Sequence, residues 1–225
     1  MIRIIKTWEP KELTQFKKKG NMKYSDLDSD EGKIVKQKLQ ESLCSEQFGL
    51  CAYCMNRITP ETMKIEHFFP QNGINKTLGL QKSLDYSNML AVCDGGELYN
   101  KIHNLSSKRN LHCDASKQNK SLSLNPSVKN EFMQMKIRYS SNGKIHSDSI
   151  NTNFQKEIDS VLNLNIPFLV SMRKAVKMKV IDYVKKTGKI TPAKKKEIIK
   201  ALRTPKDGLL PPFVDVSVFF MERLS

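Results

Sequence analysis

The chain has 225 residues, 39% of them hydrophobic, and its formal net charge is +15. This size allows one large domain, or a small one with helical additions, and the apolar fraction suffices for an ordinary core. The positive charge favours a polyanionic partner, most often nucleic acid, and the alternative is a basic protein without such a partner. No apolar run approaches the ~20 residues of a membrane span, and residues 1–6 are too short and too charged for a signal peptide. We therefore expect a cytoplasmic protein.

The first part of the chain predicts loops followed by one helix. Residues 1–32 open with a short apolar alternation and then become polar, which indicates loops and short turns. Residues 31–48 carry an apolar stripe at helical spacing, formed by Val35, Leu39 and Leu43. Gly49 is well placed to end this helix, which leads directly into Cys51.

The middle of the chain predicts short strands joined by irregular segments. The strands are residues 65–69 and residues 89–92, and residues 71–83 form a polar loop between them. Residues 94–111 show no period, so we expect an insertion loop there. A short helix follows, with Asp114 near its N-terminus.

The composition shifts after residue 125, and the remainder predicts a hairpin, three helices and an apolar tail. Asn142-Gly143 marks the tight turn of the hairpin. The second helix opens at Pro167, and Thr191 caps the third. Residues 213–220 alternate apolar and polar side chains, which predicts a strand or a docking segment. Such a segment is buried either within this chain or against a partner.

The third of these helices begins with a run of lysines, Lys194, Lys195 and Lys196. Positive charge at this end of a helix opposes the helix dipole. A phosphate group of a nucleic acid would compensate for that cost. The alternative is a solvated helix face without a partner.

The cysteines predict a structural zinc site. Five cysteines do not suit a disulfide framework, and in a reducing compartment we expect four metal thiolates and one further thiol. Four thiolates form a closed tetrahedral site with no open position for chemistry. The predicted ligands are Cys51, Cys54, Cys93 and Cys113. Cys44 falls in the helical pattern and is expected to be a small buried hydrophobe.

The second cysteine pair is split by the insertion, which leaves an alternative open. Without a metal, the cysteines would be buried thiols beside an unrelated turn. His103 and His112 are possible substitute ligands if one cysteine is not used. One bound ion would join the two ends of segment 94–111, so the insertion would leave the core undisturbed.

An acid and a histidine stand side by side at Glu66-His67, just downstream of the first cysteine pair. Neighbouring residues of a strand point to opposite faces, so the two converge only if the strand ends or bends there, as Pro70 suggests. His67 is the natural general base because its pKa is near neutrality. The alternative for His67 is a core histidine.

Further residues could complete a site for cleavage of phosphodiester bonds. Glu66 and Asp114 are hard oxygen ligands suited to Mg²⁺ or Mn²⁺, and Asn119 is a weaker competitor for the role of Asp114. Asn88 can hold a loop or orient His67. Lys117 and Lys120 can contact phosphates, although an ordinary surface lysine is the alternative for Lys117.

These residues resemble the HNH, or His-Me finger, endonuclease motif over roughly residues 51–120. The resemblance implies an α+β fold in which a β-hairpin and a helix clasp one catalytic metal (ββα-metal), with a four-cysteine zinc site. It divides the chain into an N-terminal helical lead-in at 1–50, a nuclease core at 51–125 with the insertion 94–111, and a C-terminal hairpin and helical region at 126–225. Asp114 stands where the family usually has Asn or His.

A closer resemblance covers most of the chain. Cys-Ala-Tyr-Cys, Ile-Glu-His-Phe-x-Pro-Gln, Cys-Asp-Gly, His-Cys-Asp-Ala-x-Lys and Leu-Asn-Leu-Asn look like the PtuB-type HNH nucleases of bacterial anti-phage defence, found in Septu and retron-associated systems. The resemblance implies an ABC-type ATPase partner, PtuA, and in retron systems a reverse transcriptase and its DNA. Composition and spacing do not indicate these partners.

The sequence is compatible with three functions. The leading hypothesis is a metal-dependent endonuclease that cuts DNA, or RNA including tRNA. The second is a zinc-stapled nucleic-acid-binding module that does not cut, which would have no need for Glu66-His67 and Asn88. The third is a structural subunit with a dead site, against which the intact His67 argues.

Overall fold

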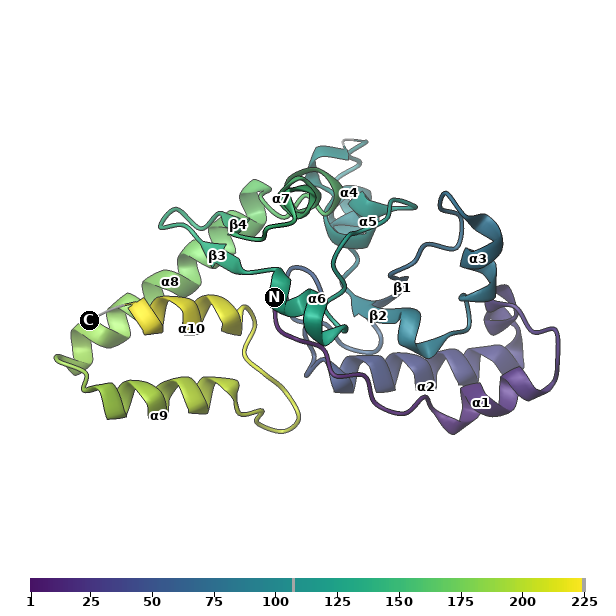
Figure 1. Ribbon diagram of the computed structural model, residues 1–225, viewed down its shortest axis with the longest axis horizontal. Helices are drawn as coiled ribbons and strands as arrows, with labels where there is room; N and C mark the ends of the chain where they lie inside the picture. Colours follow the sequence, from purple (N-terminus) through teal and green to yellow (C-terminus); the bar gives the residue numbers. More distant parts are fainter. Residues whose placement is uncertain (107, 224–225) are drawn as a thin grey trace.

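The computed structural model of the protein describes residues 1–106 and 108–223. Helices predominate, and two small antiparallel sheets complete a mixed α+β fold, as the sequence predicts. Figure 1 shows two parts, with α2 and the first sheet on the right and three long helices on the left. Among the described residues, no helix combines the length and the apolar character that crossing a bilayer requires.

The N-terminal part contains α1 (Lys11–Lys18), a 3-10 turn (Tyr24–Asp28) and α2 (Asp30–Glu46). The predicted helix at 31–48 is α2, and the Ser29 hydroxyl caps it by accepting from the Gly32 N–H at 3.1 Å. Gly49 adopts φ 68° and donates its N–H to the Cys44 carbonyl, so it ends the helix as expected. The sequence missed α1 because its lysine run resembles a loop, although Leu13 and Phe16 bury one face.

The first sheet pairs β1 (Lys64–His67) with β2 (Met89–Val92) in antiparallel register. Both strands are predicted by the sequence. β2 is fully buried, and α2 packs beside it. The Gln47 amide, just after α2, accepts from the Ala91 N–H at 2.8 Å and donates to the Ala91 carbonyl at 2.7 Å. This exchange supplies β2 with a partner on its second edge.

The segment between the strands contains α3 (Lys76–Gln81) and a 3-10 turn (Tyr86–Asn88), where the sequence predicts only a polar loop. Asn75 caps α3 by accepting the Leu78 N–H at 3.0 Å. A Cβ on Gly79 would lie 2.4 Å from the Pro70 carbonyl oxygen, so α3 packs directly on the backbone that follows β1. The helix is too short to be stable alone, and this packing explains why sequence periodicity does not find it.

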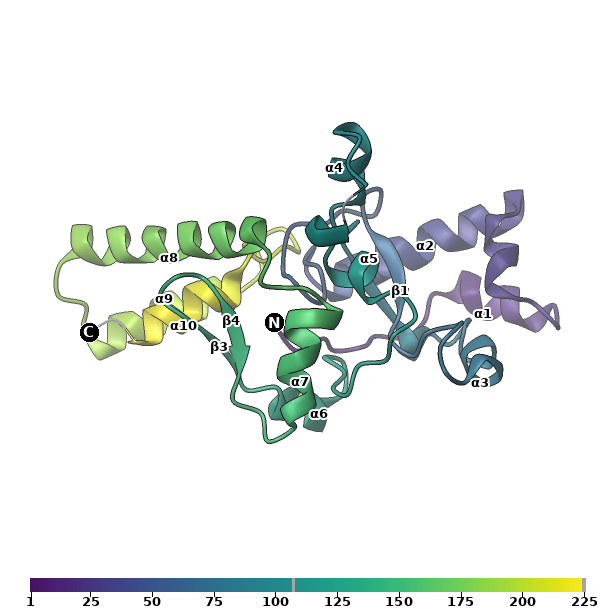
Figure 2. The ribbon, with the colours of Figure 1, turned by 90° about the horizontal axis from the view of Figure 1, so that it is seen from above.

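The insertion is also more ordered than predicted. It contains α4 (Glu97–Ile102) and a 3-10 turn (Lys108–Asn110), and α5 (Cys113–Lys117) follows it. Figure 2 shows α4 projecting from the body of the molecule. The predicted loop at 94–111 is therefore partly helical, and its residue 107 lies outside the described residues.

In the C-terminal part, the predicted hairpin and three helices appear in order, but a short helix that the sequence did not predict precedes them. α6 (Lys129–Gln134) precedes the hairpin of β3 (Ile137–Tyr139) and β4 (Ile145–Ser147), whose turn contains Gly143 with φ 90°. α7 (Thr152–Lys156) continues into a π-helical turn (Glu157–Val161). α8 (Pro167–Thr187) ends at Gly188, and Thr191 caps α9 (Pro192–Arg203).

The tail forms a helix, α10 (Val214–Arg223), so the predicted strand is wrong. Its apolar residues alternate in sequence, yet α10 packs against both α8 and α9 and so buries several sides of the helix. The buried set is Val214, Val216, Val218, Phe220 and Met221. The segment is thus buried within this chain, and its apolar character does not require a docking partner.

Val218 tests this burial because its side chain is only 2% exposed. Val218→Asp would place an unpaired charge in the contact of α10 with α8 and α9, at a cost of about 3–5 kcal/mol. We expect the thermal midpoint of the isolated protein to fall by about 10 °C in scanning calorimetry. Ile150→Asp is the control, because Ile150 is 89% exposed. Equal midpoints for the two variants would contradict the burial of α10.

Candidate functional site

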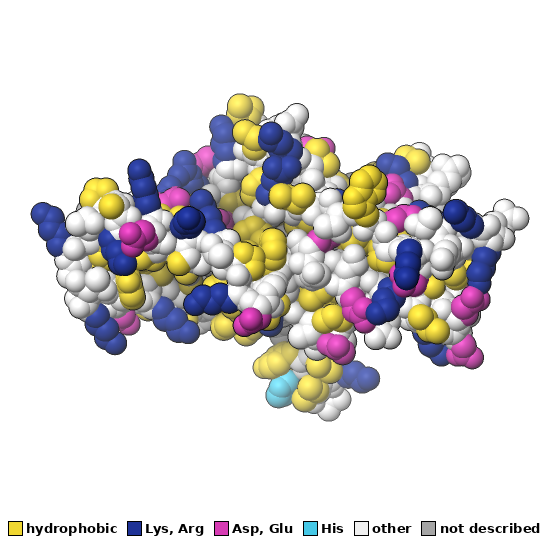
Figure 3. All heavy atoms as spheres, turned by 90° about the horizontal axis from the view of Figure 1, so that it is seen from below, with side chains coloured by type: hydrophobic (Ala, Val, Ile, Leu, Met, Phe, Trp, Pro, Cys, Tyr) yellow, Lys and Arg dark blue, Asp and Glu magenta, His cyan; other side chains and the backbone are white. Residues whose placement is uncertain are grey.

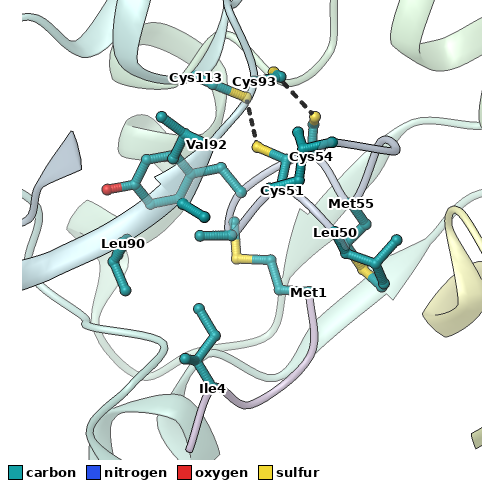
Figure 4. Close-up of a cluster of buried hydrophobic side chains, with 14 of the residues drawn as sticks. Met1, Ile4, Leu50, Cys51, Cys54, Met55, Leu90, Val92, Cys93 and Cys113 are labelled. Atoms are coloured by element: carbon teal, nitrogen blue, oxygen red, sulfur yellow. Dashed lines mark hydrogen bonds between the residues drawn. The ribbon is translucent and has the colours of Figure 1, made fainter. Parts of the chain in front are cut away.

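The four predicted cysteines come together in one buried cluster. Their sulfur atoms all lie within 4.8 Å of one another. Figure 4 marks two of these contacts, Cys51 to Cys113 at 3.8 Å and Cys54 to Cys93 at 3.7 Å. A tetrahedral ion with metal–sulfur bonds of about 2.3 Å requires sulfur separations of about 3.8 Å. The cluster could therefore hold a metal such as zinc.

Backbone geometry explains how two distant cysteine pairs meet. The first pair lies on a tight turn, in which Met55 adopts φ 66° and donates its N–H to the Cys51 carbonyl at 3.0 Å. The second pair is joined at the base of the insertion, where the His112 N–H donates to the Gly95 carbonyl at 3.0 Å. A Cβ on Gly95 would lie 2.3 Å from the His112 carbonyl oxygen, so only glycine permits this approach.

The histidines suggested as substitute ligands lie outside the four-sulfur cluster. His112 Nε2 is 3.7 Å from Cys93 Sγ, but His112 is not part of the group whose ligand atoms all lie close to one another. His103 is exposed on the projecting insertion and stacks on Tyr99. Cys44 is also separate, since its thiol faces the Ile58 carbonyl at 3.7 Å. The cysteine quartet needs none of these groups.

Glu66 is the centre of a buried polar cluster at the end of β1. Its Oε1 accepts the Tyr53 hydroxyl at 3.0 Å and lies 2.7 Å from Lys117 Nζ. Burial raises the pKa of Glu66 to about 8, the Lys117 charge opposes this shift, and a hydrogen bond with Asp114 adds to it. Glu66 and Asp114 thus form a carboxylate pair that offers hard oxygen ligands to a cation.

His67 follows Glu66 directly and ends β1, two residues before the end of the predicted strand at 65–69. Its Nε2 lies 2.8 Å from the Ser83 carbonyl oxygen, which can only accept, so Nε2 carries the proton. Nδ1 therefore presents its lone pair, and the Gln71 amide donates to it at 3.1 Å. Burial lowers the pKa of His67, and the Lys117 charge contributes to this shift, so the imidazole is neutral near pH 7.

Asp114 acts electrostatically on both neighbours. It raises the pKa of Glu66 and the pKa of the His67 imidazole. Tyr24, from the N-terminal 3-10 turn, covers the His67 ring edge to face at 4.6 Å. The result is a base beside acidic groups in a largely buried setting, with Glu66 4% and His67 7% exposed.

Asn88 holds the loop that carries these groups. Its Oδ1 accepts the Phe69 N–H at 2.7 Å, and its Nδ2 donates to the Phe69 carbonyl at 3.1 Å. The Asn88 carbonyl also accepts the Phe68 N–H at 2.9 Å. Together these bonds fix the chain immediately after His67, which sets the direction of the imidazole.

The remaining predicted site residues, the lysines and Asn119, lie in three different settings. Lys117 is fully buried against Glu66, which differs from the surface position that a phosphate contact requires. Lys120 and Asn119 are exposed beyond α5. The lysines Lys194, Lys195 and Lys196 lie on the first turn of α9, in the other part of the molecule in both ribbon views.

On the one face that Figure 3 shows, charge does not single out a binding path. On the face shown in Figure 3, Lys and Arg side chains are spread across the molecule with acidic side chains among them. Lys194 itself pairs with Glu197 at 2.9 Å. The net charge therefore gives a general attraction for polyanions, whereas the site itself is defined by buried groups.

Sequence reasoning missed three residues that shape the site. Gln71 belongs to the Pro-Gln pair after His67, but its contact with Nδ1 depends on the loop conformation. Tyr53 lies inside the Cys-x-x-Cys pair, so its position there was the available signal. Tyr24 comes from a distant segment, and no local pattern could have placed it against His67.

Part of the chain is similar to a known protein. The chain is 35% identical over 121 residues to a protein named retron Ec83 putative HNH endonuclease, from Escherichia coli. The match covers 52% of this chain and 46% of that protein, so the chain spans about half the length of the curated relative it matches. No protein-family model matches the chain. The similarity and the four-cysteine cluster together fit an HNH-type core.

The cysteine cluster predicts a coupling of metal content and stability. Cys113→Ser should reduce bound metal and lower the unfolding midpoint, because the binding free energy of a structural metal adds to folding. Cys44→Ser is the control, since Cys44 is a buried thiol outside the cluster. Metal content would be measured by mass spectrometry of the purified variants, alongside thermal unfolding. Full metal content in Cys113→Ser would contradict a four-thiolate site.

Proposed function

We propose that this chain is a metal-dependent HNH endonuclease of the His-Me finger type, which hydrolyses phosphodiester bonds of nucleic acid. The observation that carries the proposal is the neutral His67 imidazole, whose Nδ1 lone pair is defined by the Nε2 bond to Ser83, beside the carboxylates of Glu66 and Asp114. The order β1, β2 and α5 supports a ββα-metal core. The similarity to a retron HNH endonuclease supports the same reaction class.

Each residue of the site has a separate role in the proposed reaction. His67 accepts a proton from the attacking water through Nδ1, and this requires water to replace the Gln71 amide at that atom. Ser83 holds the imidazole in the reactive tautomer, and Asn88 fixes the backbone next to it. A divalent ion such as Mg²⁺ or Mn²⁺, held by Glu66 and Asp114, would supply charge stabilisation for the phosphate and the leaving oxygen.

We assign zinc to the cysteine cluster and a purely structural role to that ion. Four thiolates leave no open position, and all four cysteines are buried. Thiolates of this kind persist in a reducing cytoplasm. The ion would join the first cysteine turn to the end of β2 and the start of α5, and so hold Asp114 beside β1.

The biological setting is proposed as anti-phage defence. The resemblance to PtuB-type nucleases suggests an ABC-type ATPase of the PtuA kind as a partner, and in a retron system also a reverse transcriptase and its DNA. The retron name of the similar protein supports this setting. DNA is the proposed substrate, and RNA including tRNA fits the same chemistry.

A second candidate is a nucleic-acid-binding module that does not cut. The observation that favours it is the Lys117 ammonium, which lies within the carboxylate cluster where a catalytic ion would bind. Metal-dependent cleavage separates the two functions, because a binding module would retain nucleic acid without converting it.

His67→Ala tests the proposed reaction. The variant should lose at least about 100-fold in cleavage rate, the usual contribution of a general base, and keep its affinity for nucleic acid. Cleavage of plasmid DNA, single-stranded DNA and RNA would be followed on gels with Mg²⁺ or Mn²⁺ and with a chelator. His103→Ala is the control, because His103 is exposed on the insertion. A His67→Ala variant that cuts at the wild-type rate would refute the catalytic assignment.

A further inference from the structure

Lys117 is the most unusual charged group in the site. Its side chain has no exposed area, although lysines are among the residues least often buried. Its Nζ lies 2.7 Å from Glu66 Oε1 and 3.2 Å from the His67 carbonyl oxygen. A positive group therefore already sits among the oxygens to which a divalent cation would bind.

The geometry is incompatible with an ammonium and a divalent ion at the same oxygen. Mg²⁺ binds oxygen at about 2.1 Å. Glu66 Oε1 already accepts the Tyr53 hydroxyl and contacts the Lys117 ammonium. A divalent ion on that oxygen would lie next to the ammonium in a buried setting, where repulsion between like charges is strong. The ammonium and the ion therefore compete for this oxygen.

Formal charges show where the ammonium would go. With both carboxylates ionised, as metal binding requires, Glu66, Asp114 and Lys117 sum to −1. A divalent ion changes this sum to +1, and one phosphate of a bound nucleic acid restores neutrality. Lysine is a compact point charge on a flexible stem, and Lys117 lies one helical turn from Asp114 on α5. The ammonium can therefore turn away and remain near the site.

We propose that Lys117 holds the position of the catalytic cation in the metal-free protein and contacts a substrate phosphate once a divalent ion has displaced it. The inference rests on the proposed function insofar as it assigns the divalent ion to Glu66 and Asp114. Its consequence is that metal and nucleic acid bind cooperatively. The metal frees the ammonium for the phosphate, and the phosphate offsets the charge that the metal adds. By linkage, each ligand raises the affinity of the other by the same factor.

Variants at Lys117 measure this coupling in the full chain. Mn²⁺ binding would be followed by electron paramagnetic resonance in a His67→Ala background, which removes the proposed base but keeps the backbone carbonyl. Each variant would be titrated with and without a short single-stranded DNA, a short RNA and a duplex DNA. The variants are Lys117→Met, which removes the charge, Lys117→Arg, which keeps it, and Lys129→Met at an exposed lysine of α6 that has no role in the predicted site.

We expect Lys117→Met to bind Mn²⁺ about tenfold more tightly than the parent when no nucleic acid is present, within the usual range of coupling between sites. The affinity of Lys117→Met should no longer rise when nucleic acid is added. Lys117→Arg and Lys129→Met should keep the dependence on nucleic acid. An Mn²⁺ affinity in Lys117→Met that equals or falls below that of the parent would overturn the proposal.

Chemical labelling of the wild-type protein tests the displacement without a substitution, and remains available if Lys117→Met does not fold. A lysine-acetylating reagent should modify Lys117 slowly without metal, because its Nζ is buried and ion-paired. Saturating Mg²⁺ should increase this rate several-fold, whereas Lys120 on the same peptide region should react equally under both conditions. Continued protection of Lys117 at saturating Mg²⁺ would overturn the proposal.

The two proposals can fail separately. A protein that binds Mn²⁺, exposes Lys117 and does not cleave any nucleic acid would refute the nuclease and support the displacement. A protein that cleaves in a His67-dependent manner while Lys117 stays protected would support the nuclease and refute the displacement.

Discussion

The convergence of four thiols from three separate segments is the constraint on which the rest of the site depends. The segments are the turn after α2, the end of β2 and the start of α5. Cys113 directly precedes Asp114, so fixing this thiol also fixes the carboxylate that meets Glu66. Because β1 is paired with β2, the same cluster sets the distance between His67 and α5. A structural metal would therefore position the reactive groups without contacting them.

Buried polar contacts hold the reactive groups. Burying these charged groups costs free energy, which other interactions must offset. An isolated buried charge is strongly unfavourable, and a buried pair is neutral at best compared with apolar packing. Glu66 and Lys117 compensate one another, and Tyr53 adds a hydrogen bond. Buried ionic groups with perturbed pKa values are typical of functional sites. Their retention here is more readily explained by chemistry than by stability.

Local patterns in the sequence predicted much of the fold. The Cys-x-x-Cys turn, β1, β2 and the Asn142-Gly143 hairpin all depend on residues close in the chain. The helices that were missed depend on contacts from elsewhere. α3 is stabilised by Gly79 against Pro70, and α10 by its burial between α8 and α9. The alternating apolar pattern of the tail predicts a strand, whereas in the structure α8 and α9 bury several sides of a helix.

The same distinction applies to the site. The sequence could name the cysteines, Glu66, His67 and Asp114, because their residue types and spacing specify the chemistry. It could not show that Lys117 is buried, because that depends on how α5 packs beside β1. It could not identify Gln71 or Tyr24 as neighbours of His67 either. The reactive nitrogen is likewise set by a contact from outside the motif, the bond of His67 Nε2 to the Ser83 carbonyl.

The most direct test is a crystal structure of the protein grown with Mn²⁺, with anomalous scattering recorded at the zinc and manganese absorption edges. A zinc signal should lie about 2.3 Å from all four cysteine sulfurs, and a manganese signal should lie between Glu66 and Asp114. A cysteine cluster that binds no metal, or a manganese ion bound away from these carboxylates, would contradict a thiolate-positioned catalytic site.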